Sequence, residues 1–194
     1  MREALTAATE HALTVRGTVM LEPGWCAICA SVQGDLEVRV GEPRKRKHRR
    51  WLEANGFTHR VDAWSHPLWP GAGPGVAVET LAAALEHGHG LDPDTPLRQV
   101  LVQPGVVTAA DATHADALAA AFTGLDGRVH IELGRPAEPL AWVAMENGEL
   151  VVEVDPDSDE VFGRYRDPRE AAEALVAHLG CGEHDPLFIA LLDS

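Results

Sequence analysis

The chain has 194 residues, of which 45% are hydrophobic, and it carries a formal net charge of −14. This composition can fill the core of one large domain or of two small ones, and no apolar run is long enough to cross a bilayer. An acidic surface repels phosphate backbones, so nucleic-acid binding by the bulk of the surface is not expected. Three cysteines and an N-terminal segment without the apolar stretch of a secretory signal favour a cytoplasmic protein.

The first half of the chain predicts helices that alternate with short strands. Leu5, Ala8 and Ala12 recur on one face of an N-terminal helix. Alternation of apolar and charged residues over 36–40 is typical of a half-buried strand. The expected elements of this half are, in chain order, the N-terminal helix, strands over 18–22, 26–32 and 36–40, a helix that ends at Asn55, a helix over 76–87, and a strand over 97–102.

The second half predicts a similar series. Asn147-Gly148 is a strong signal for a two-residue hairpin turn, because both residue types tolerate a positive φ. Asp167 can cap a helix that begins at Pro168, and Glu170 would complete a capping box. The expected elements are a helix over 111–122, strands over 129–133, 140–145 and 150–154, the helix from Pro168, and a strand over 187–192.

The second half also repeats the residues of the first. Gly17-Thr-Val-Met-Leu-Glu-Pro-Gly24 aligns with Gly127-Arg-Val-His-Ile-Glu-Leu-Gly134, and later segments match in the same order. We interpret this as an internal duplication of one supersecondary module. The sequence therefore predicts an α+β fold of two related helix–antiparallel sheet–helix modules. The first spans 1–95 and contains a basic and Trp-rich insert, and the second spans 96–194.

The cysteines suggest redox or metal chemistry, but the predicted strand opposes it. Trp25-Cys26-Ala-Ile-Cys29 has the spacing of a thioredoxin-like motif, which needs a helix after the first thiol. Residues three apart on a strand point to opposite faces, so the two sulfurs should diverge. We interpret both as buried strand cysteines. The alternative is a zinc-binding or thiol-redox protein that uses Cys26, Cys29, Cys181 and His184.

Two segments concentrate charge of one sign. Residues 44–50 contain six of the sixteen Lys and Arg residues, and Arg46, Arg49 and Arg50 could share one face of a helix. This run is interpreted either as a patch for an anionic partner or as a solvated helix that pairs with the protein's own acids. The acidic segment 155–160 lacks the glycine and the final glutamate of a calcium loop, so it is interpreted as a solvated loop.

A family resemblance rests on the segment that follows the basic run. It comprises Leu52-Glu-Ala-Asn-Gly-Phe57, Trp64, Trp69, the helix over 76–87 and Asp92-Pro93. In this pattern the chain resembles the type III secretion chaperone-like superfamily, in particular the YbjN-like and TY-Chap domain proteins of actinobacteria. The resemblance implies helices packed against a small antiparallel sheet and no catalytic residues. It also implies capture of another polypeptide, with homodimers usual among secretion chaperones.

The expected function is therefore non-catalytic protein binding, of a chaperone-like or regulatory kind, with an unidentified protein partner. Neither an enzyme activity nor a cofactor is expected. Exposed aromatic residues often dominate such contacts, so Trp64 and Trp69 are the predicted partner-binding residues. Arg46, Arg49 and Arg50 are predicted to contribute through the basic run.

Overall fold

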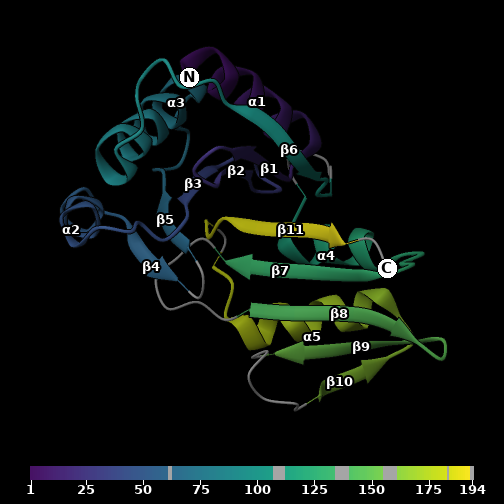
Figure 1. The fold of residues 1–194 in the computed structure, drawn as a ribbon. Coiled ribbons are helices and arrows are strands. Elements are labelled where there is room, and N and C mark those ends of the chain that lie inside the picture. Colours follow the sequence, from purple (N-terminus) through teal and green to yellow (C-terminus); the bar gives the residue numbers. More distant parts are fainter. Residues whose placement is uncertain (61–62, 107–111, 134–139, 155–160, 183, 193–194) are drawn as a thin grey trace. The chain divides into compact units, whose positions relative to one another are not determined.

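The computed structural model describes residues 1–60, 63–106, 112–133, 140–154, 161–182 and 184–192, which form two compact units (Figure 1). Unit 1 consists of Met1–Ala30 and Gly34–Val102, and unit 2 consists of Ser31–Gln33 and Gln103–Ser194. Each unit contains one sheet and its helices, which confirms the α+β class. The acidic segment 155–160 lies outside the described residues. None of the helices in the described ranges has the length and hydropathy needed to cross a membrane.

Unit 1 is a six-stranded sheet whose strand order is β4-β5-β3-β2-β1-β6. The helices α1 and α3 pack against each other and against the inner strands, and residues such as Leu5, Val38 and Leu81 fill the core between these layers. Its elements are α1 (Arg2–Val15), β1 (Thr18–Glu22), β2 (Cys26–Ala30), β3 (Leu36–Val40), α2 (Arg46–Ala54), β4 (Thr58–Arg60), β5 (Ala63–Pro67), α3 (Pro74–Ala83), the π-helix η1 (Ala84–His89) and β6 (Arg98–Gln103).

Unit 2 is a five-stranded sheet whose strand order is β10-β9-β8-β7-β11. The helices α4 and α5 pack against each other, and residues such as Phe122, Ile131 and Leu175 fill its core. Its elements are α4 (His114–Phe122), β7 (Arg128–Leu133), β8 (Leu140–Glu146), β9 (Glu149–Val154), β10 (Val161–Tyr165), α5 (Pro168–Leu179) and β11 (Leu187–Leu192).

The predicted hairpin turn and the predicted helix cap at Asp167 are both present, whereas the capping box lies at a different helix. Asn147 and Gly148 have φ values of 51° and 80°, which confirms the predicted two-residue hairpin. Asp167 caps α5 by accepting a hydrogen bond from the amide of Arg169, and Pro168 is the first helical residue. The reciprocal capping box is found instead at α4, where Thr113 and Asp116 bond each other's backbone amides.

The two sheets have their strands in the same order when the strands of each unit are matched by their place along the chain. Strands β5, β3, β2, β1 and β6 of unit 1 occupy the same sequence of positions as β10, β9, β8, β7 and β11 of unit 2. The additional elements of unit 1 are α2 and β4. The unpredicted strands are β4, β5 and β10, whose residues do not alternate cleanly between apolar and polar. The predicted boundary after residue 95 precedes β6, which belongs to unit 1.

Candidate functional site

Strand β6 is an exposed edge strand of unit 1. It follows β1 as the last strand of the sheet, and no described strand pairs with its outer edge. Val100 is 43% exposed and its neighbour Leu101 is 45% exposed. Successive side chains of a strand point to opposite faces, so both faces of β6 are partly exposed at this position. An apolar strand edge of this kind is a template for pairing with another chain.

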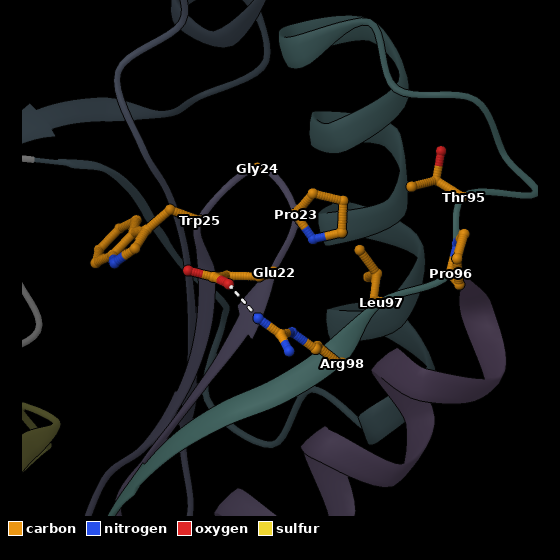
Figure 2. A pocket seen from close by; sticks show the side chains of 8 residues that line it. All are labelled: Glu22, Pro23, Gly24, Trp25, Thr95, Pro96, Leu97 and Arg98. Carbon is orange, nitrogen blue, oxygen red and sulfur yellow. Dashed lines mark hydrogen bonds and ion pairs between the residues drawn. The ribbon is translucent and has the colours of Figure 1, made fainter.

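An open pocket of about 660 Å³ lies beside the start of β6 (Figure 2). It is lined by the turn between β1 and β2 and by the segment that leads into β6. In Figure 2 the side chains of Pro23 and Leu97 lie in the middle of the group, and the ring of Trp25 points away from them. The lining residues are Glu22, Pro23, Gly24, Trp25, Thr95, Pro96, Leu97 and Arg98.

The turn between β1 and β2 is held in an unusual backbone conformation. Gly24 has a φ of 97°, and a Cβ there would lie 2.9 Å from Cδ1 of Leu91. Trp25 has a φ of 36°, a region that residues with a side chain seldom adopt. The amide of Gly41 donates a 2.9 Å hydrogen bond to the carbonyl oxygen of Trp25, which anchors the turn to the end of β3. The wall of the pocket is therefore fixed by unit 1 itself.

The pocket is lined by one acidic and one basic side chain, Glu22 and Arg98, which pair with each other. Nη2 of Arg98 lies 3.3 Å from Oε2 of Glu22, and both side chains are largely exposed. Such a surface pair contributes little stability and can exchange partners. Asp92 and Asp94, on the loop before β6, are also exposed. The site therefore combines an open strand edge with a pocket whose two charged lining residues, Glu22 and Arg98, pair with each other.

The prediction that Trp64 is an exposed partner contact is corrected, because its side chain is buried. Its side chain is only 5% exposed and belongs to the core of unit 1. On β5 it lies opposite Val40 of β3, so it shares the face that the helices cover. Its Nε1 donates a 2.8 Å hydrogen bond to Oε2 of Glu42. Trp69, just beyond β5, is 59% exposed, as the predicted contact requires.

The three predicted arginines lie together on α2, and all are exposed. Arg49 forms an ion pair with Glu42, so one of them is held by the protein's own carboxylate. Arg46 and Arg50 have no ion pair with any described residue. The structure therefore divides the predicted arginine set into one paired residue and two unpaired residues.

The cysteines are divided between the units, with Cys26 and Cys29 in unit 1 and Cys181 in unit 2. Cys26 and Cys29 are both buried on β2, but only Cys26 belongs to the core beneath the helices. Burial raises the pKa of the Cys26 thiol to about 12, which disfavours the thiolate that metal binding and redox exchange require. Cys181 and His184 follow α5 in unit 2. Across the described ranges, no group of three or more His, Cys, Asp or Glu side chains could hold a metal ion.

The sequence reasoning did not identify the pocket and the exposed edge. Pro23-Gly24 is a turn signal that could have located one wall of the pocket. The exposure of β6 has no such signal, because Val100, Leu101 and Val102 form a continuous apolar run that usually indicates burial on both faces.

The resemblance to secretion chaperone-like proteins rests on loosely placed hydrophobic, glycine and tryptophan residues of unit 1, so membership of that superfamily stays a prediction. Comparison of the chain with models of protein families, with curated proteins and with solved structures found no match.

Proposed function

We propose that the chain is a non-catalytic polypeptide-binding protein, chaperone-like or regulatory, and that it captures an extended segment of its partner along β6. The main support is the uncovered edge at Val100 and Leu101. An edge strand offers a row of backbone N–H and C=O groups to a second extended chain, and the hydrogen bonds depend little on the partner's sequence. Affinity would therefore come mainly from the backbone of β6.

The pocket beside β6 would supply the selectivity. Its apolar lining residues, which include Pro23 and Leu97, suit one apolar side chain of a captured segment. The carboxylate of Glu22 lines the pocket and pairs with the guanidinium of Arg98, and the exposed Asp92 and Asp94 lie on the loop before β6. Opposite charge across an interface speeds association and selects partners. The favoured segment therefore carries an apolar residue flanked by Lys or Arg.

The proposal is tested with peptides selected from a displayed random library on the full-length protein. Val100→Pro and Leu101→Pro form a matched pair, because neighbouring amides of a strand point to opposite edges. One variant removes an outward N–H and should keep the fold while losing peptide affinity by about tenfold or more. The other removes an N–H directed toward β1 and should reduce stability in urea.

Hydrogen exchange on the wild-type protein gives a second, independent readout. Bound peptide should slow the exchange of amides in β6, because they acquire hydrogen-bond partners. Protection confined to other strands would contradict the proposed site. Selected peptides that bind both proline variants as tightly as wild type would contradict it equally, provided that both variants are folded.

A further inference from the structure

The basic run leaves most of its cations without partners in a protein rich in carboxylates. Outside the run, every described arginine except Arg16 pairs with an Asp or Glu. Within it, the only described ion pair joins Arg49 to Glu42. The remaining five cations are exposed and unpaired among the described residues: Arg44, Lys45, Arg46, Lys47 and Arg50.

The geometry of α2 gathers these cations on its outer side. Leu52 is fully buried in the core of unit 1, and the ring of Trp51 lies 5.4 Å from the ring of His87. At 100° per residue, Arg46 and Arg50 fall on the opposite side of the helix from Leu52. The one carboxylate on that side is Glu53, in the last turn of α2. The outward face therefore has a large excess of positive charge.

This arrangement is unfavourable for the isolated chain. Arg46 and Arg50 are four residues apart, where like charges destabilise a helix by about 0.2–0.5 kcal/mol per pair. The first turn of α2 holds no acidic residue, and Lys45 at the N-cap makes no side-chain cap. The positive end of the helix dipole therefore adds to the same charge. No described intramolecular contact compensates for this repulsion, so a partner of opposite charge would relieve it.

We propose that the outer face of α2 is a second binding surface and that its ligand is an acidic segment of another polypeptide. Charge complementarity identifies the ligand as an anion. The net charge of −14 opposes a densely charged nucleic acid, and the face offers no uncovered aromatic platform for bases, since Trp51 contacts His87. A membrane surface requires apolar side chains that insert, whereas the apolar side of α2 is buried against its own core.

The surface lies apart from the proposed peptide-binding edge. Helix α2 precedes β4, which ends the sheet of unit 1 on one side, and β6 ends it on the other. The two surfaces also differ in charge, because the pocket beside β6 is lined by a paired Glu22 and Arg98, whereas α2 carries cations that pair with no described residue. The inference therefore does not rest on the proposed function, and the two can fail separately.

Binding is measured by fluorescence anisotropy with a labelled peptide of alternating Glu and Ser as the probe. Arg46→Glu/Arg50→Glu should raise its dissociation constant by about tenfold or more, and added salt should weaken wild-type binding. Arg164→Glu/Arg166→Glu in unit 2 changes the net charge equally and should leave the dissociation constant within about twofold of wild type. The two proline variants in β6 should also bind the acidic probe normally.

Three results would overturn this inference. The first is equal affinity of the acidic peptide for wild type and for Arg46→Glu/Arg50→Glu. The second is tighter binding of a thymidine oligonucleotide of equal charge, which would assign the face to nucleic acid. The third is tighter binding of phosphatidylserine vesicles. Urea denaturation checks that the α2 variant is folded, and relief of like-charge repulsion should leave its stability unchanged or raised.

Discussion

The close contact between α2 and η1 can be tested by adding an atom on one side of it and removing atoms on the other. Gly88 of η1 faces Leu52 of α2, and a Cβ at Gly88 would lie 2.8 Å from Cδ2 and 3.1 Å from Cγ of Leu52. Leu52 is fully buried, so its side chain has little room to move. Gly88→Ala should therefore overpack the contact and cost about 1–3 kcal/mol of unfolding free energy. Leu52→Ala should cost about 2–5 kcal/mol through lost burial and a cavity.

The double variant separates this steric explanation from a general effect of each substitution. The new methyl group at position 88 would occupy space that the shortened side chain at position 52 leaves empty. The double variant should therefore be more stable than the sum of the single effects predicts, by about 1 kcal/mol or more. Gly75→Ala is the matched control, because a Cβ there meets nothing within 4 Å and should be neutral or slightly stabilising.

Urea denaturation followed by tryptophan fluorescence is a suitable assay. Trp25, Trp51, Trp64 and Trp69 lie in unit 1, whereas only Trp142 lies in unit 2, so the signal mainly reports unit 1. Single effects that add within about 0.5 kcal/mol would refute the reasoning, because sites without contact behave additively. A Gly88→Ala variant as stable as wild type would refute it directly.

Three further predictions concern stability. Thr113→Ala should remove the cap of α4 and cost about 1 kcal/mol of unfolding free energy in urea denaturation. Hydrogen bonds, first from the side chain of Thr113, lower the pKa of Asp116. The stability that the ionised Asp116 contributes should therefore be lost as pH falls below its ordinary pKa of 3.8. Burial raises the pKa of Cys26 from 9.0 to about 12, so wild type should lose stability relative to Cys26→Ala as pH rises above 9.0. Burial lowers the pKa of His89, so stability should fall as pH drops below 6.5, and His89→Gln should fall less.

The sequence predicted best those elements in which the apolar periodicity ends where turn or capping residues begin. Strands β1, β3 and β11 have the expected bounds, because apolar residues and turn signals delimit them. The hairpin at Asn147 and Gly148 was predicted from residue types that tolerate a positive φ. Strands β5 and β10 were missed because tertiary pairing, not local propensity, defines them. The position of β10 in unit 2 is the same as that of β5 in unit 1, so either strand could have indicated the other.

The burial of Trp64 shows why partner contacts are harder to predict than elements. Trp64 lies in the Trp-rich insert of the first half and was predicted to be an exposed partner contact. The face of Trp64 depends instead on its register against Val40, which the sequence does not determine. Its indole N–H then requires an acceptor, and Oε2 of Glu42 provides one at 2.8 Å. The same carboxylate lies 3.2 Å from Nε2 of His59 and pairs with Arg49.

Strands β6 and β11 show how similar sequences acquire different roles. Both contain apolar residues and end their sheets in equivalent positions. Leu187 and Ile189 of β11 are buried in the core of unit 2, whereas Val100 and Leu101 of β6 are exposed. Burial depends on which elements pack against a strand, and these are remote in sequence. Val102 of β6 packs against the core of unit 1, whereas Val100 and Leu101 stay partly exposed. The core of unit 1 therefore does not account for these two apolar residues, and this is why we propose partner binding at β6.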